Sequence, residues 1–195
     1  MIILASTSPR RNEILQGLKI PFQIKTPRFK EETAPHLSPE AEAIFFALEK
    51  AKSIIDKTLI ASAPHLIIGS DTLLALENEK IGKPKDEEDA FQILKKLRGK
   101  THQILSSLAL LQISSSGQIQ EETHLEKVSV SMKNYSDEEI QNYLQLDQPW
   151  DKAGAYSIQE NAKSLMKNFE GEFEAAMGLP LTYLKNYLAH PQRHF

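Results

Sequence analysis

The chain has 195 residues, 41% of them hydrophobic and 25% charged, which predicts one soluble globular domain or two closely packed lobes. Its net charge of −3 gives no general attraction to nucleic acid or membrane, so any anion-binding surface must be local. There are no cysteines, which excludes disulfides, thiolate metal sites and cysteine nucleophiles. No apolar run approaches the roughly 20 residues that span a bilayer, and we expect a cytoplasmic protein.

The first third of the chain predicts alternating strands and helices. The apolar stretch "MIILA" predicts a strand, followed by a helix that Ser8 caps and Pro9 begins. "PFQIKT" is a second strand candidate, and residues 39–56 predict an amphipathic helix. Lys50 lies opposite the apolar stripe of that helix, free to face solvent or a cleft. The predicted stripe consists of Ala41, Ile44, Phe45, Leu48, Ala51 and Ile55.

The rest of the chain begins with a strong signal for a buried strand, "HLIIGSDTLLAL", which "ENEK" turns back toward "IGKP". Asp86 caps the next helix and Gly99 ends it. "HQILSSLALLQI" and "THLEKVSVSM" flank "SSSGQ" as a long hairpin. A helix over "SDEEIQNYLQL", a strand over "SLMKNFEG" and a helix over "LPLTYLKNYL" follow. The hairpin interrupts the alternation, which favours a mixed α/β sheet over a parallel one.

The first helix carries Arg10 and Arg11 in its first turn, where the helix dipole disfavours cations. Its free backbone N–H groups, two guanidiniums and the hydroxyls of "STS" would together bind a phosphate group. The plain alternative is that both arginines point into solvent or pair with acidic residues. On the phosphate interpretation, removing Arg11 is expected to leave the stability of the ligand-free protein unchanged or slightly higher.

Asp71 follows the apolar part of "IIGSDT", next to a glycine that would let a ligand approach, and could accept a proton from water or hold a metal. A turn aspartate bonded to backbone is the plain alternative. Lys83 projects from "IGKPK", which lacks the spacing of a P-loop. Glu31 and Glu32 form a carboxylate pair that could hold a hard cation, although such pairs are common on surfaces. Together these residues predict a hydrolase of phosphate esters or nucleotides.

The ordered motifs "LASTSPRRNEIL", "IIGSDTLLAL", "IGKPKDEEDAFQILKKLRGKTH", "SDEEIQNYL", "DKAGAYSIQ" and "GLPLTYL" make the chain resemble the Maf family over almost its whole length. The resemblance implies a single Maf-like nucleotide pyrophosphatase domain over residues 1–195. It implies the fold of the inosine triphosphate pyrophosphatases, which is a mixed, elongated central sheet flanked by helices, with two lobes around a cleft. It also implies cleavage of a nucleoside triphosphate between its α- and β-phosphates, a divalent metal (Mg²⁺ or Mn²⁺) and a homodimer.

The same resemblance assigns roles to particular residues. Asp71 matches the proton acceptor, Glu31 an acidic site residue with Glu32 beside it, and Lys83 a catalytic lysine that handles phosphate. The metal would be held by Glu31, Glu32 and Asp71. The other substrate-binding positions are Ser6, Arg10, Arg11, Lys50, Thr72 and Gln159.

Three positions separate family members that act on dTTP and UTP from those that act on 7-methyl-GTP. Here they are Arg10, Thr72 and Gln159, all of the pyrimidine type, whereas "GSD" in place of "GAD" echoes the other group. An amide such as that of Gln159 can both donate to and accept from a pyrimidine edge. The alternatives are a 7-methyl-GTP pyrophosphatase and a low-turnover, nucleotide-sensing regulator of septum formation.

The chain departs from the family pattern in three places. Ser157 and Glu160 replace two glycines around "SIQE", and "SSL" at residues 106–108 replaces "TGV". "FEAAMGLP" stands where "YSNVVGLP" is usual, which changes residues 174–176. These changes are expected to lower activity or alter substrate choice without touching the acidic and basic centre.

Overall fold

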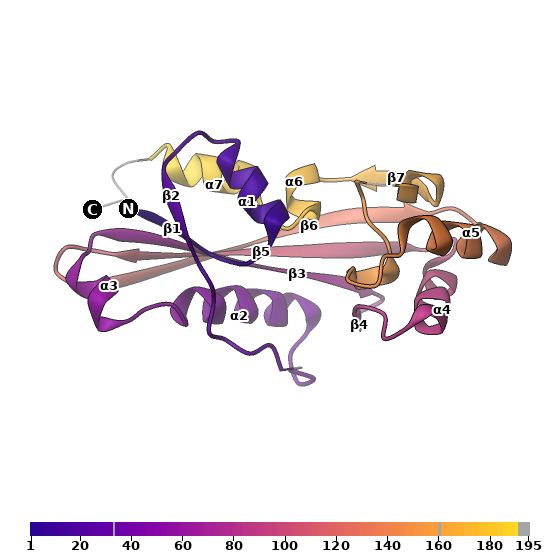
Figure 1. Cartoon of the computed structure of the whole chain (residues 1–195), viewed down its shortest axis with the longest axis horizontal. Coiled ribbons are helices and arrows are strands. Elements are labelled where there is room, and N and C mark those ends of the chain that lie inside the picture. Colours follow the sequence, from indigo (N-terminus) through magenta and orange to yellow (C-terminus); the bar gives the residue numbers. More distant parts are fainter. Residues whose placement is uncertain (33, 160, 191–195) are drawn as a thin grey trace. The chain divides into compact units, whose positions relative to one another are not determined.

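The computed structural model describes residues 1–32, 34–159 and 161–190. Its described strands form one seven-stranded sheet in the order β2-β1-β3-β5-β6-β7, with β4 paired to β3 (Figure 1). Strand β1 is parallel to β2 and β3, whereas β4 is antiparallel to β3 and β7 to β6, so the predicted mixed sheet is confirmed. The strands are β1 Ile2–Ala5, β2 Phe22–Lys25, β3 His65–Leu76, β4 Glu79–Ile81, β5 Thr101–Ile113, β6 Ile119–Met132 and β7 Met166–Glu170.

The predicted helices begin close to their expected first residues, because their capping residues act as the sequence indicates. The side chains of Ser8, Asp86 and Ser136 accept hydrogen bonds from the first turns of α1, α4 and α5. Short helices α3 and α6 were not predicted, since four or five residues show no helical period. The helices are α1 Pro9–Gln16, α2 Pro39–Lys52, α3 Lys57–Ala61, α4 Glu87–Leu97, α5 Asp137–Asp147, α6 Phe173–Ala176 and α7 Leu181–Leu188, with 3₁₀ turns at Ala153–Ala155 and Asn161–Ser164.

The chain divides into two compact units. Within the described chain, unit 1 contains residues 1–72, 106–126 and 172–190, and unit 2 contains residues 73–105 and 127–171. No helix of the described residues is long and apolar enough to cross a membrane.

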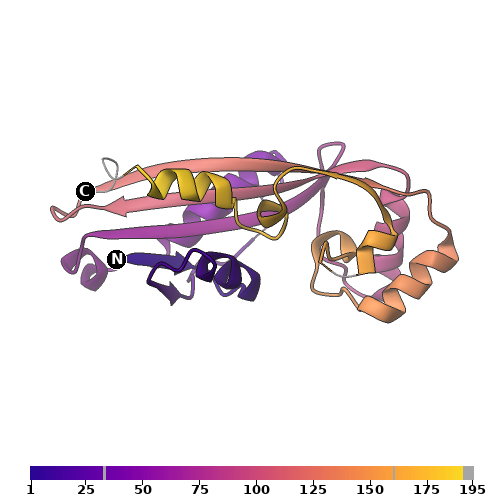
Figure 2. The same cartoon turned by 90° about the horizontal axis from the view of Figure 1, so that it is seen from above.

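Unit 1 has helices on both faces of its part of the sheet (Figure 1). Alternate side chains of β1 explain the two layers. Leu4 packs with the residues of α1 and α7, and Ile3 and Ala5 pack with α2 and α3. Figure 2, seen from above, shows the yellow helix α7 lying along the hairpin strands.

Helix α2 corrects the predicted pattern. It ends at Lys52, and its buried face is one position away from the predicted stripe, so that Phe45 is 41% exposed. The buried face contains Ala43, Phe46, Ala47, Lys50 and Ala51. A Cβ at Gly69 would lie 2.2 Å from the Ala47 carbonyl oxygen, so this glycine admits the helix against β3 and not a ligand. Close approach therefore selects small residues for the buried face, and Lys50 is buried with them.

Unit 2 contains α4 and α5 (Figure 1) and a buried polar pair. His102 is 1% exposed, and its Nε2 lies 2.6 Å from the Tyr156 hydroxyl oxygen. Burial lowers the pKa of His102 to about 4 and raises the pKa of Tyr156. His102 is therefore neutral in the folded protein at neutral pH.

The unfolding free energy is expected to fall on acidification because of His102. Between the ordinary pKa of about 6.5 and the folded value of about 4, only the unfolded histidine binds a proton, so stability is lost as pH falls. The expected loss between pH 8 and pH 5 is about 2 kcal/mol. Urea unfolding of the wild type and His102→Gln at both pH values measures it. Equal losses in the two proteins would refute the assignment, because His65 is retained in both.

Candidate active site

The predicted site residues of unit 1 lie where β1 ends. Ala5, the last residue of β1, pairs with Gly69, so residues 70–72 of β3 extend past their parallel neighbour. Asp71 therefore lies inside β3, which covers the whole predicted strand "HLIIGSDTLLAL" and continues past Asp71 to Leu76. The end of a parallel strand is still beside it, which is the usual position of ligand sites in α/β sheets.

Lys50 joins two carboxylates at this place. Its Nζ lies 2.5 Å from Asp71 Oδ1 and 2.7 Å from Glu31 Oε1. Lys50 is 8% exposed and Asp71 only 4%, whereas the Glu31 side chain is 55% exposed. The predicted position of Lys50 opposite the apolar face, free to meet solvent or a cleft, was wrong, because Lys50 lies on the buried face of α2, beside Asp71.

The second oxygen of Asp71, Oδ2, is buried and makes no hydrogen bond within the described residues. Unpaired buried carboxylate oxygens are costly, and they occur where a ligand, an ion or a proton is to be received. Ser107 fixes the backbone here, since its hydroxyl donates to the carbonyls of Ala43 (2.6 Å) and Asp71 (3.2 Å). Sequence reasoning noted Ser107 only as a departure from the family pattern and missed this contact.

Arg11 forms the second cluster. Its Nε donates to the Gly178 carbonyl at 2.8 Å, and its two terminal nitrogens donate to Thr72 Oγ1 at 3.2 Å and Ser6 Oγ at 3.4 Å. Burial lowers the pKa of Arg11, whereas the carboxylates nearby raise it. The side chain thus links α1 to β3 and to the segment before α7. It has these partners without phosphate, whereas the sequence indicated a side chain used only for binding phosphate.

Gly178 is a site residue that sequence reasoning missed, although it lies within the motif "GLPLTYL". Its φ is +111°, and a Cβ there would lie 3.2 Å from Thr72 Oγ1 and 3.3 Å from Arg11 Nε. Its carbonyl also accepts from Ser70 Oγ at 2.6 Å. The positive φ and the close approach together explain why glycine stands here.

Replacing Arg11 with alanine is now expected to destabilise the ligand-free protein. Three hydrogen bonds from a charged group are lost, and we expect a loss of about 2 kcal/mol in unfolding free energy. Urea unfolding measures the loss, with Arg10→Ala as the matched control that should change it by less than about 0.5 kcal/mol. Unchanged stability in Arg11→Ala would instead support the interpretation that Arg11 serves to bind phosphate and not to stabilise the ligand-free protein.

Arg10 remains the candidate for phosphate. Its side chain is half-buried and has no hydrogen-bond or ion-pair partner within residues 1–32, 34–159 and 161–190. Ser6 is 4% exposed, and its hydroxyl already accepts from the Ser8 backbone N–H at 3.1 Å. The roles of both residues stay predictions.

Lys83 and Gln159 belong to unit 2, and both are exposed. Their motifs are joined there, because the Gly154 backbone N–H donates to the Gly82 carbonyl at 3.0 Å. Ser157 is buried, and its backbone N–H donates to the Tyr143 hydroxyl at 3.2 Å. Glu160, the neighbouring departure, lies outside the described residues.

The remaining departures from the family pattern lie in unit 1. Residues 174–176 lie in α6, where Ala175 is buried. The hydroxyl of Ser106 lies 3.5 Å from that of Thr72. This departure therefore touches a predicted substrate-binding residue.

The residues available for a metal are the carboxylates of Glu31 and Asp71, with Glu32 exposed beside them. Among the described residues, no group of three or more histidine or acidic side chains could by itself hold a metal ion. Mg²⁺ is commonly held by one or two carboxylates together with substrate phosphates. Glu31 and Asp71 already share one cation, the Lys50 ammonium, which fits that arrangement. The trio with Glu32 stays a prediction.

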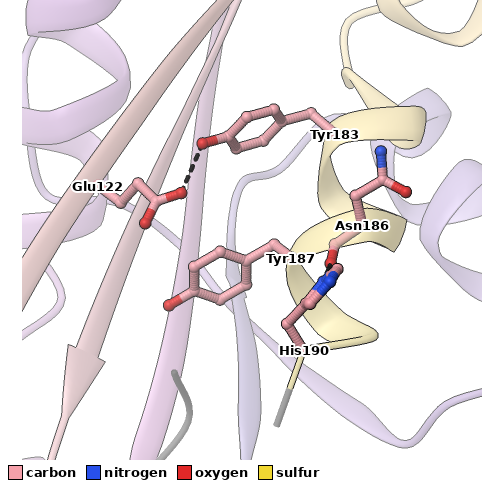
Figure 3. A pocket seen from close by; sticks show the side chains of 5 residues that line it. All are labelled: Glu122, Tyr183, Asn186, Tyr187 and His190. Carbon is pink, nitrogen blue, oxygen red and sulfur yellow. Dashed lines mark hydrogen bonds between the residues drawn. The ribbon is translucent and has the colours of Figure 1, made fainter. Parts of the chain in front are cut away.

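A separate cavity in unit 1 lies between β6 and α7 (Figure 3). It is lined by Glu122, Tyr183, Asn186, Tyr187 and His190. The Tyr183 hydroxyl donates to Glu122 at 2.5 Å. None of the predicted site residues lines this cavity, so it is not the candidate active site.

The comparisons with known proteins cover almost the whole chain. A family model described as "Maf-like protein" matches residues 1–190. The chain is 37% identical to the dTTP/UTP pyrophosphatase of Alkaliphilus oremlandii, over 92% of this chain and 90% of that protein. It is 39% identical to the dTTP/UTP pyrophosphatase of Dictyoglomus turgidum, over 96% and 94%. The structure of the Staphylococcus aureus Ham1 protein shares the fold, with a TM-score of 0.52 at 17% identity, covering 96% of this chain and 97% of that one.

Proposed function

The chain belongs to the Maf family, and from this premise we propose that it hydrolyses nucleoside triphosphates, with dTTP and UTP preferred, to the nucleoside monophosphate and pyrophosphate. Two relatives that are named dTTP/UTP pyrophosphatases support these two substrates. The single structural observation that carries the proposal is the buried Lys50–Asp71 pair with its unpaired Asp71 oxygen.

The proposed chemistry places Asp71 as the base. Its Oδ2 accepts a proton from water, whose oxygen forms a new bond to phosphorus as the bond between the α- and β-phosphates breaks. Lys50, Arg10 and Lys83 are proposed to supply positive charge to the phosphates. Phosphoryl chemistry depends mainly on such positioning and charge neutralisation.

A divalent metal, Mg²⁺ or Mn²⁺, would when bound neutralise phosphate charge and make the water more acidic. We propose Asp71 and Glu31, with Glu32 beside them, as the protein's ligands for this metal. Because Lys50 contacts the first two carboxylates, it also holds them together before the metal and substrate arrive.

We further propose that Thr72 and Gln159 recognise the pyrimidine base. The Thr72 hydroxyl is held by Arg11 and lies 3.5 Å from Ser106 Oγ, so its direction is set by the protein. The exposed Gln159 amide can donate to and accept from a pyrimidine edge.

Residues 1–195 are proposed to act as one Maf-like domain, as a homodimer, in the cytoplasm where nucleotides are used.

The preference is tested by kcat/KM for dTTP, UTP and 7-methyl-GTP, with Mg²⁺ and pyrophosphate release as the readout. We expect both pyrimidine nucleotides to exceed 7-methyl-GTP by about tenfold or more, since a missing hydrogen-bond match leaves site groups unpaired. Gln159→Glu is the matched variant and should weaken the pyrimidine preference.

A preference for 7-methyl-GTP would refute the substrate assignment. Nucleotide binding without pyrophosphate release would instead identify a sensor that regulates septum formation. Equal rates on all three nucleotides would show that the departures from the family pattern at Glu160 and at residues 174–176 have loosened the selection of the base.

A further inference from the structure

The segment that carries Glu31 is attached to helix α2 at both ends. At one end, the Arg28 backbone N–H donates to Ser53 Oγ at 3.0 Å, and Arg28 Nε donates to the Ser53 carbonyl at 2.9 Å. At the other end, the Ala34 backbone N–H donates to Glu42 Oε2 at 3.0 Å. Glu42 is only 4% exposed. A buried carboxylate on α2 thus accepts a hydrogen bond from the backbone three residues after Glu31.

Between these two attachments, Phe29 packs against the same helix. Its ring centroid lies 6.1 Å from that of Phe45 and 5.5 Å from that of Phe46, both in edge-on geometry. Phe46 is 5% exposed, so this contact reaches the core. Aromatic pairs of this geometry add to the gain from buried area.

Helix α2 also carries Lys50, one turn after Phe46 and about two turns after Glu42. All three side chains are on the buried face of the helix. The helix therefore holds both partners of the Lys50–Glu31 ion pair, one directly and the other through the attached segment. The ion pair alone could not order the segment, because a pair with a half-exposed member contributes little against the entropy of fixing several residues.

We propose that Glu42 and Phe29 are positioning residues that hold Glu31 against Lys50 during the reaction. Neither touches the reacting atoms, and both act through Glu31. This inference rests on the proposed function, since Glu31 matters only if the Lys50–Asp71 site is catalytic.

The kinetic test compares Glu42→Leu with the conservative Glu42→Gln. Leucine removes the acceptor for the Ala34 N–H, whereas the glutamine carbonyl retains it. We expect kcat/KM on dTTP to fall about tenfold in Glu42→Leu, because small misplacements of site groups are costly. Glu42→Gln should remain within about twofold of wild type.

The background variant Glu31→Gln separates positioning from general damage. If Glu42 acts through Glu31, Glu42→Leu should cause no further loss of kcat/KM in that background. Equal losses in both backgrounds would overturn the proposal, and so would full activity of Glu31→Gln.

Limited trypsin digestion gives a second readout that needs no activity. Trypsin cleaves after Lys30, inside the attached segment. Neither Glu42→Leu nor Phe45→Ala, which removes a ring partner of Phe29, changes the sequence at the cleavage site. Both variants should speed the cleavage several-fold, whereas Glu42→Gln should leave its rate unchanged. Unchanged cleavage in both would overturn the attachment. If no nucleotide is hydrolysed, the proposed function fails, while the digestion still decides whether Glu42 and Phe29 hold the segment.

Discussion

Asp71→Asn is expected to fold and to bind nucleotide, yet to lose turnover by a factor on the order of 10²–10⁴. The amide is nearly the same size as the carboxylate but cannot accept the proton of the attacking water. The buried Oδ2, unpaired within the described residues, is the atom that would receive this proton. Pyrophosphate release on dTTP under saturating conditions measures the loss.

The control is thermal unfolding of the same variant with and without nucleotide, which separates lost chemistry from lost binding. Near-normal turnover in Asp71→Asn would remove Asp71 from the role of base. A role limited to holding metal predicts partial recovery at high metal concentration, whereas a base predicts none.

Lys50→Met should cost about 3 kcal/mol of unfolding free energy, in addition to abolishing turnover. The side chains of Lys50 and Asp71 are 10% and 6% exposed, so removing the ammonium leaves a buried carboxylate without its cation. Such an unpaired charge is more harmful than loss of the pair. Urea unfolding of the purified variant measures the effect.

The double variant Lys50→Met/Asp71→Asn tests this explanation. With the charge of Asp71 removed, most of the loss caused by Lys50→Met should be recovered, giving a large non-additive interaction energy. Purely additive losses would show that Lys50 stabilises the protein through its packing alone. Neither outcome depends on the nucleotide.

The sequence alone predicted most of the elements, because the signals for them are local. Caps at Ser8, Asp86 and Ser136 and the alternating or continuous apolar runs are properties of neighbouring residues. Family motifs likewise identified the chain, and the comparisons confirm the Maf family. The predicted roles of individual site residues, by contrast, remain to be tested.

Only the tertiary structure decided which side of α2 is buried. Hydrophobic periodicity gave weight to the large side chains at Ile44 and Phe45, whereas close packing against Gly69 favours Ala47, beside the correctly predicted Ala51. Small residues are weak signals in a sequence but decisive where a helix backbone approaches a strand. That choice buries Lys50 beside Asp71.

The tertiary structure also decided what Arg11 and Glu31 contact. The sequence marked Arg11 as unfavourable for the helix dipole, and that local argument holds. Its partner Gly178 is 167 residues away along the chain, and Glu31 meets Lys50 across 19 residues. No local rule specifies such pairs, since they depend on how helices and loops pack on the sheet. The sequence by itself therefore determined the elements and the family, and the fold determined which charges are paired, buried or left to receive a ligand.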